Sequence, residues 1–165
     1  MFRQATEADI PQIMEIIGAT VQEMKSYNNP QWDEHYPLAA DFQADIEQNW
    51  LYVLEEDQVI QGFVCLNTVS GKSYPKISWQ DSSTPLVMRR MGVRPASRRN
   101  GIAAKLLLQA ELLAKEQGIT VIKMDTFCRN DKMNSFARKN GFIHRGTVCI
   151  WDIDEPFYFY EKVLQ

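Results

Sequence analysis

One segment of the sequence combines residue types and a spacing that suit the binding of an anion. It runs from Val93 to Ala103 and joins an apolar run to the start of a helical pattern. The first N–H groups of a helix lack intrahelical partners, and the helix dipole favours negative charge there. Gly101 lets a phosphate approach the backbone, and Arg98 and Arg99 add cationic donors. The pattern Arg-x-x-Gly-x-Ala therefore predicts a phosphate-binding loop. A plain basic loop that caps a helix is the alternative.

The same residues distinguish this loop from two common nucleotide-binding loops. It lacks the Gly-Lys-Ser/Thr ending of a Walker loop. It also lacks the Gly-x-Gly-x-x-Gly pattern of dinucleotide binders.

The elements that must position this loop follow from hydrophobic periodicity. Apolar residues at helical spacing predict helices over residues 7–25, 39–48, 101–117 and 130–140. Apolar and β-branched runs predict strands over 50–54, 59–67, 86–93, 119–126, 142–151 and 157–163. With an N-terminal strand ahead of the first helix, the order is strand, two helices, three strands, helix, strand, helix and two strands. We predict a single α/β (α+β) domain over residues 1–165, with a mixed, mostly antiparallel sheet, helices on both faces and a right-handed central crossover.

Composition excludes several functional classes. The net charge is −3 and no long basic block occurs, so nucleic-acid binding is not expected. No apolar run approaches the roughly 18 residues that span a membrane, and no targeting segment is visible, so we expect a cytoplasmic protein. The three cysteines are widely spaced and only two histidines occur, which argues against disulfides and against a metal site. We expect the cysteines to be small buried side chains.

With the loop and its flanking elements in place, the sequence resembles the GNAT family of N-acetyltransferases. In that family the cofactor loop reads Gln/Arg-x-x-Gly-x-Gly/Ala after a strand that ends Val-x-Pro, and Arg98, Gly101 and Ala103 fill this pattern. A second shared element is a strand followed by an Asn and a short helix that ends in Gly-Phe, here Asn130 and Gly141-Phe142. The resemblance covers essentially the whole chain and extends to a set of bacterial proteins without a settled substrate. It implies a GNAT-like acyl-CoA N-acyltransferase fold.

The resemblance also implies which residues bind acetyl-coenzyme A. The backbone of Met91, Gly92 and Val93 would pair with the pantetheine arm like an added strand. The amides from Arg98 to Ala103 would hold the pyrophosphate, namely those of Arg98, Arg99, Asn100, Gly101, Ile102 and Ala103. Asn130 would hydrogen-bond the pantetheine, with Met133 and Phe136 packed nearby. Asn130 also suits a plain helix N-cap, and one residue can do both.

The candidates for catalysis include one departure from the family pattern. Many members carry a Tyr four residues before the Gly of Gly-Phe as the general acid, and this chain has Ala137 there. Asp125 is the candidate base, because several members place a catalytic Glu on this strand; a structural carboxylate is the alternative. Tyr158 and Tyr160 are candidate acids, and water is another. We expect these two tyrosines to face opposite sides of their strand, so that at most one is well placed.

Aromatic and basic residues in the irregular segments are candidates for the acceptor pocket. Trp32, Tyr36, Trp79 and Arg90 are the main ones, and His35, Tyr74 and Arg89 are further candidates. The alternatives are that the tryptophans hold loops onto the core and that the arginines meet structural carboxylates.

The predicted function is transfer of an acetyl group from acetyl-CoA, the co-substrate, to a primary amine without a metal. A small molecule or an amino acid is favoured over a protein as acceptor. The alternative is a non-catalytic acyl-CoA-binding sensor or regulatory module, which Ala137 supports. We expect no nucleic-acid or membrane partner, and the resemblance leaves a homodimer open.

Overall fold

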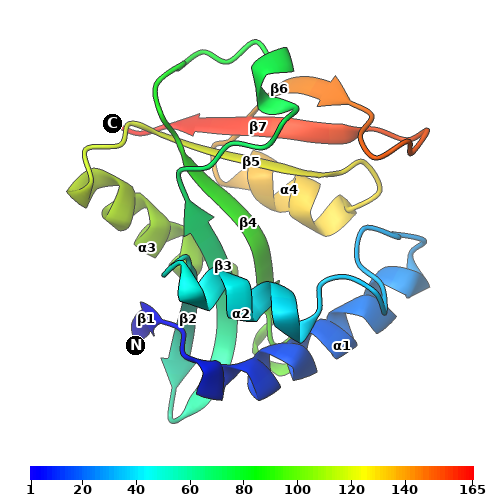
Figure 1. Cartoon of the computed structure of the whole chain (residues 1–165), viewed down its shortest axis with the longest axis vertical. Helices are drawn as coiled ribbons and strands as arrows, with labels where there is room; N and C mark the ends of the chain where they lie inside the picture. Colours follow the sequence, from blue (N-terminus) through cyan, green and yellow to red (C-terminus); the bar gives the residue numbers. More distant parts are fainter. The chain divides into compact units, whose positions relative to one another are not determined.

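The computed structural model describes residues 1–165, and its elements follow the predicted order. The strands are β1 (Phe2–Gln4), β2 (Leu51–Glu56), β3 (Val59–Asn67), β4 (Leu86–Val93), β5 (Val121–Phe127), β6 (Ile143–Val148) and β7 (Phe157–Val163). The helices are α1 (Ile10–Ser26), α2 (Ala39–Glu47), α3 (Ile102–Glu116) and α4 (Asp131–Lys139), with 3-10 turns η1 (Glu7–Asp9), η2 (Tyr74–Lys76) and η3 (Pro95–Ser97). Figure 1 traces these elements along the chain.

The predicted mixed sheet is confirmed. Its seven strands have the order β1-β2-β3-β4-β5-β7-β6. β4 and β5 pair in parallel, and the pairs β1–β2, β2–β3, β5–β7 and β6–β7 are antiparallel. The parallel pair is joined by α3, which is the crossover that a parallel connection requires.

The chain forms two compact units, each assembled from two separate stretches. The first unit contains Met1–Leu66 and Arg89–Ala110, and the second contains Asn67–Met88 and Glu111–Gln165. β4 and α3 therefore each contribute residues to both units. The assignment of residues 1–165 to a single domain stays a prediction.

In the first unit, helices cover both faces of the strands. α1 and α2 pack over one face, where Ile13, Ile16 and Phe42 join Phe63 in a buried core (Figure 1). The rings of Phe42 and Phe63 meet edge to face with centroids 5.3 Å apart. Gly62 points to the other face, where an added Cβ would lie 3.0 Å from the Ile102 side chain of α3. Because neighbouring residues of a strand alternate, Gly62 and Phe63 bring different helices to the two faces.

In the second unit, the register of β5 with β7 decides which side chains share a face. Lys123 lies opposite Glu161, Asp125 opposite Phe159, and Phe127 opposite Phe157. Cross-strand partners point to the same side of a sheet. These side chains therefore form one face, and the segment between β3 and β4 covers it with Tyr74 and Ile77.

Two local predictions differ from the structure. The strand predicted over 142–151 ends at Val148, because Trp151 and Asp152 have φ values of 56° and 54°, which a β-strand cannot accommodate. The cysteines are not all buried: Cys65 is, but Cys128 is half-buried and Cys149 is exposed.

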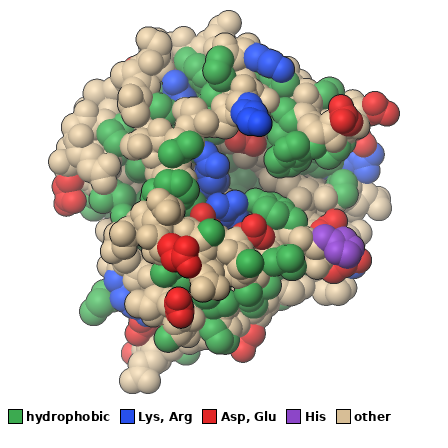
Figure 2. Space-filling model, in the orientation of Figure 1, with side chains coloured by type: hydrophobic (Ala, Val, Ile, Leu, Met, Phe, Trp, Pro, Cys, Tyr) green, Lys and Arg blue, Asp and Glu red, His purple; other side chains and the backbone are tan.

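Two surface properties bear on the predicted partners. None of the helices has the length and apolar character of a membrane span. Figure 2 shows acidic and basic side chains interspersed on the face that it draws.

Candidate functional site

The backbone at the start of α3 has the form that an anion site needs. Gly101 has φ +73°, and an added Cβ would meet no atom within 4 Å. Ala103 and Ala104 keep the first helical turn small, and its N–H groups have no intrahelical acceptors. Arg99, with φ +66°, and Asn100 are exposed beside it. The residues present therefore fit a diphosphate such as that of coenzyme A, held by backbone amides.

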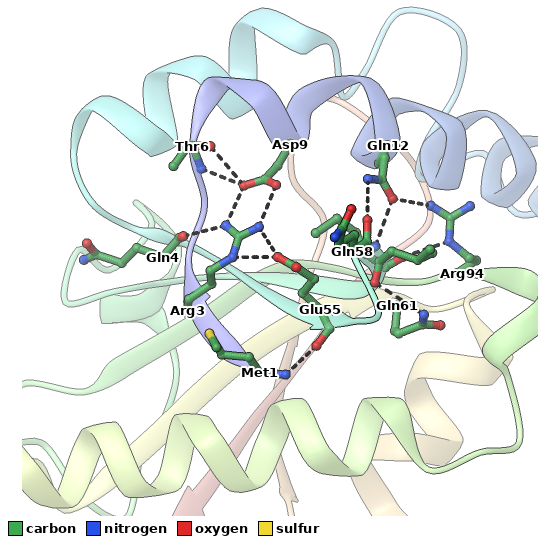
Figure 3. Close-up of polar contacts among 12 residues, drawn as sticks. Met1, Arg3, Gln4, Thr6, Asp9, Gln12, Glu55, Gln58, Gln61 and Arg94 are labelled. Atoms are coloured by element: carbon green, nitrogen blue, oxygen red, sulfur yellow. Dashed lines mark hydrogen bonds and ion pairs between the residues drawn. The ribbon is translucent and has the colours of Figure 1, made fainter.

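The entry to this loop is anchored to α1 and β3 by Arg94 (Figure 3). Its Nε donates to the carbonyl oxygen of Ile60 at 2.8 Å, and its Nη2 donates to Gln12 Oε1 at 3.2 Å. The backbone N–H of Arg94 donates to the carbonyl oxygen of Gln61 at 2.8 Å. Gln12 Oε1 also accepts the N–H of Ile60 at 2.9 Å. Contacts with α1 and β3 of the first unit thus fix the direction in which the chain enters the loop.

The side chain of Arg98 does not have the surroundings that the sequence predicted. Its guanidinium forms an ion pair with Glu23 of α1 and lies 3.5 Å from the hydroxyl of Thr20. Partial burial lowers the pKa of Arg98. Its guanidinium therefore ties the loop to α1, while the amide of Arg98 remains a predicted ligand of the pyrophosphate.

Arg90, a predicted pocket residue, binds a carboxylate of its own unit. Its Nε and Nη2 donate to the two oxygens of Asp45 at 2.9 and 2.6 Å, and its Nη1 donates to the Tyr36 hydroxyl at 2.9 Å. Asp45 is buried on α2. The structure thus favours the alternative in which Arg90 meets a structural carboxylate.

The backbone of Arg90 marks an irregularity in β4. It has φ +46°, an unusual value for a strand residue with a side chain. The predicted pantetheine-binding residues Met91, Gly92 and Val93 follow directly. Gly92 is buried, and a Cβ there would lie 2.6 Å from the Phe63 ring, so only glycine fits. The local backbone of β4 is therefore set by both strain and packing at this point.

The other predicted pocket residues of the first unit lie in contrasting places. Trp32 is buried in the core with α1 and α2, which supports the alternative that it holds its loop onto the core. Tyr36 is 37% exposed and keeps its hydroxyl on Arg90. His35 is exposed.

In the second unit, the candidate base Asp125 has a specific partner. The hydroxyl of Tyr74 donates to Asp125 Oδ1 at 3.0 Å. Asp125 is half-buried, whereas Tyr74 is 5% exposed. Trp79, a predicted pocket residue, is half-buried beside them and donates its indole N–H to the backbone oxygen of Tyr74 at 2.8 Å. The pairing of Tyr74 with Asp125 was not apparent from sequence, because 51 residues separate them.

The candidate acids lie on the other face of β7. Tyr160 is buried and its hydroxyl donates to Asn134 Oδ1 of α4 at 2.7 Å; burial raises its pKa. Tyr158 is half-buried, and both tyrosine rings contact His144 with centroids 5.3 and 5.7 Å away. The expectation that the two tyrosines face opposite sides was wrong, because residues two apart on a strand share a face. The face of both is opposite to that of Asp125, whose cross-strand partner is Phe159.

α4 shows why Asn134, which sequence reasoning missed, is important. Its side-chain amide donates to the carbonyl oxygens of Phe127 and Cys128 at 3.1 and 3.3 Å while its oxygen accepts from Tyr160. Asn134 therefore joins α4 to the end of β5 and to β7. The signal in the sequence was an Asn in a helix interior, where it is unfavourable unless its amide is bonded.

The remaining α4 residues have the following places. Asn130 is the N-cap, its side chain accepting the Met133 N–H at 3.2 Å, as one of the two alternatives predicted. Met133 and Phe136 are half-buried, and Ala137 is completely buried. None of these contacts tests the predicted binding of pantetheine.

Comparisons with known proteins agree with this picture. The family described as "Acetyltransferase (GNAT) family" matches residues 18–142. No curated protein matches the sequence. A candidate acetyltransferase from Staphylococcus aureus Mu50 is similar at 28% identity and a TM-score of 0.79, over 100% of this chain and 99% of that one.

Two further solved structures share the fold. A GNAT-family acetyltransferase from Streptococcus agalactiae 2603 has 24% identity and a TM-score of 0.85, over 100% of this chain and 95% of its own. The PaiA N-acetyltransferase of Thermoplasma acidophilum, solved in complex with coenzyme A, has 19% identity and a TM-score of 0.72, over 99% and 98%. With a family match over most of its length and this sheet, the chain belongs to the GNAT family of acetyltransferases.

Proposed function

We propose that this protein transfers the acetyl group of acetyl-CoA to the primary amine of a small molecule or an amino acid. The observation that carries the proposal is the open glycine at the start of α3, where Gly101 leaves room for a phosphate above orphaned helix amides. A structural neighbour that binds coenzyme A supports the choice of donor. The donor supplies a thioester whose carbonyl carbon accepts the amine.

The proposed roles of the chain's residues divide between donor binding and proton transfer. The amides from Arg98 to Ala103 hold the pyrophosphate. The backbone of Met91, Gly92 and Val93 holds the pantetheine, with Asn130, Met133 and Phe136 beside it. A strand amide near Met91 polarises the carbonyl oxygen. Larger side chains in place of Gly101, Ala103 or Ala104 would fill the space that this binding needs.

Asp125 is the proposed general base. A lysine-like amine has a pKa of about 10.4, so near pH 7.4 only about one molecule in a thousand is neutral. The N–C bond to the acetyl group forms as the thioester C–S bond breaks, and the amine proton passes to Asp125 directly or through water. The thiolate takes a proton from water or from Tyr158, because Tyr160 already gives its hydrogen to Asn134.

The proposed pocket for the acceptor amine uses side chains that keep polar or aromatic surface exposed. Tyr36 and Trp79 remain candidate pocket residues, whereas Trp32 and Arg90 support the structure around them. We place the protein in the cytoplasm and keep homodimerisation as a hypothesis that light scattering would decide.

The test begins with calorimetric titration of acetyl-CoA into the protein and two variants. Gly101→Asp adds a carboxylate where the phosphate would lie, and we expect at least a hundredfold weaker binding. Gly118→Asp is the matched control, because Gly118 has φ +68° and equally open surroundings but follows the other end of α3. Equal binding by wild type and Gly101→Asp would contradict the proposed loop.

A panel of amines with detection of the released thiol then tests catalysis. Release of coenzyme A above the rate of hydrolysis without amine supports the transferase. Tight binding of acetyl-CoA with no turnover across small amines, amino acids and peptides would favour the alternative, a non-catalytic acyl-CoA sensor. The observation that favours this alternative is Ala137, which is buried at the position where many GNAT proteins carry a Tyr that acts as the general acid.

A further inference from the structure

Tyr74 and Asp125 form a polar pair next to an apolar cluster on one face of the second unit. Phe127, Phe157 and Phe159 surround this face together with Ile77. The Tyr74 ring meets Phe159 edge to face, with centroids 5.5 Å apart and an interplanar angle of 83°. Phe159 is also the cross-strand partner of Asp125. The ring contact and the strand register therefore bring the hydroxyl and the carboxylate to one place.

The position of Tyr74 is set by its own segment rather than by Asp125. Its N–H donates to the carbonyl oxygen of Gly71 at 3.0 Å, which closes the turn that leads into the 3-10 turn η2. The indole N–H of Trp79 donates to the carbonyl oxygen of Tyr74 at 2.8 Å. With its ring packed and its backbone bonded on both sides, Tyr74 presents its hydroxyl in one direction.

A buried carboxylate fastens the far end of this segment to the sheet. Glu161 is 1% exposed and accepts the backbone N–H groups of Gln80 at 2.6 Å and Asp81 at 3.4 Å. Lys123 donates to the carbonyl oxygen of Asp81 at 2.8 Å and lies 4.4 Å from the Trp79 ring centroid. Residues 74–81, the tyrosine strap, are thereby attached to β5 and β7 at the end away from Tyr74.

The other charged groups on this face mostly form hydrogen bonds and ion pairs with one another. Lys123 on β5 faces Glu161 on β7 in register. Arg145 on β6 donates to Glu161 at 2.7 Å. Asp81 on the strap accepts from Ser83 and Thr120. Each of these charged groups therefore has a partner of its own, and the Tyr74 hydroxyl is a direct hydrogen-bond donor to Asp125.

We propose that Tyr74 is the positioning residue for Asp125, holding the carboxylate in a fixed orientation for accepting the proton of the acceptor amine. The inference rests on the proposed function with Asp125 as base. A hydrogen bond to the charged form of a carboxyl favours that form and lowers its pKa. A bonded oxygen also restricts the side-chain rotamer, which a general base needs for a constant reach to its proton.

The first readout is the titration of Asp125 in the free protein, which needs no substrate. ¹³C spectra of protein labelled at the aspartate carboxyls are recorded against pH, and the Asp125 signal is identified by its absence in Asp125→Asn. We expect Tyr74→Phe to raise the pKa of Asp125 by about one unit, because it removes one hydrogen bond to a charged group. Tyr52→Phe is the matched control. The Tyr52 ring stacks on the Phe2 ring in the first unit, with centroids 5.2 Å apart, and removal of its hydroxyl should leave the pKa of Asp125 unchanged.

The second readout is the pH dependence of kcat/KM with the best amine of the panel. In Tyr74→Phe the acidic limb should move up by the same amount as the Asp125 pKa. We expect kcat to fall about tenfold while KM for acetyl-CoA stays unchanged. Trp79→Phe, which removes the donor to the Tyr74 carbonyl, should cause a smaller change in the same direction. In an Asp125→Asn background, Tyr74→Phe should have no further effect on kcat.

The outcomes separate the failure of the inference from the failure of the proposed function. An unchanged Asp125 pKa in Tyr74→Phe, with only the melting temperature lowered, makes Tyr74 a packing residue and overturns the inference. A raised pKa with an unmoved acidic limb removes Asp125 as base and with it the role of Tyr74. A raised pKa in a protein that binds no acetyl-CoA overturns the proposed function, while the hydrogen-bonded pair itself stands.

Discussion

The predicted phosphate-binding loop of the first unit, Arg98–Ala103, and the Tyr74–Asp125 pair of the second unit are built in different ways. The loop owes its form to neighbours in sequence: a strand end, a glycine with positive φ and the first turn of α3. The pair owes its form to the register of β5 with β7 and to the tyrosine strap, whose Tyr74 lies 51 residues before Asp125 in the sequence. The conformation of the loop is local, so a sequence motif can predict it. The pair depends on contacts that no motif describes, so it is also the more easily broken by distant substitutions.

The largest expected effect sharpens the chemical side of this comparison. Asp125→Asn should lower kcat/KM by about 10²–10⁴-fold, since a positioned general base contributes about that much. The acidic limb of the pH profile should disappear with it. Asp154→Asn, an exposed aspartate of the β6–β7 hairpin, serves as the control. Full activity of Asp125→Asn at every pH would leave only a structural role for this carboxylate.

A pair of glycine substitutions tests the packing of the first unit. Gly62→Ala should destabilise the protein by about 1–3 kcal/mol, because the new Cβ would lie 2.9 Å from the Gly92 carbonyl oxygen and 3.1 Å from Leu106. Gly18→Ala should stabilise it by about 0.5–1 kcal/mol, because Gly18 is exposed within α1 and its Cβ would meet nothing within 4 Å. Urea unfolding measures both. Equal effects of the two substitutions would contradict the close approach of β3 and α3.

Tyr160→Phe tests whether the face opposite Asp125 is structural. Without the hydroxyl, the buried Asn134 oxygen loses its donor, which should cost about 1–2 kcal/mol of unfolding free energy. The pH profile of kcat/KM should keep its shape, in contrast to that of Tyr74→Phe. If instead the basic limb moved while stability did not, Tyr160 would be the acid that the sequence suggested.

The smallest effect concerns the N-terminal edge of the first unit. Arg3 donates to both oxygens of Asp9 at 2.8 and 2.9 Å, also drawn in Figure 3, and this holds the pKa of Asp9 below its ordinary value. The folded state then binds fewer protons, so this contribution to stability is present above the ordinary Asp pKa near 3.8 and is lost as pH falls through the lowered value. Unfolding measured from pH 6 to 2 should therefore lose part of its slope in Asp9→Asn. Asp57→Asn, in the exposed β2–β3 turn, should keep the whole slope.

Most of the fold was predictable because its signals are local. The order of helices and strands is the predicted one, and the bounds of β3, β4 and β7 agree to the residue. Helical and alternating periodicities, together with the cap at Asn130, lie within a few residues of the structure that they determine. The error at the end of β6 arose because Trp151 and Asp152 adopt positive φ without the glycine that normally signals it.

The sequence by itself indicated the family, and it predicted the phosphate-binding loop at Arg98–Ala103 and the candidate base Asp125. Only the tertiary structure decided which side chains act together: Arg98 with Glu23, Arg90 with Asp45, Tyr160 with Asn134, and Tyr74 with Asp125. The physical reason is the distance along the sequence over which each interaction acts. A backbone conformation depends on a few neighbouring residues, whereas a hydrogen bond between distant side chains depends on the register and packing of every element that carries them.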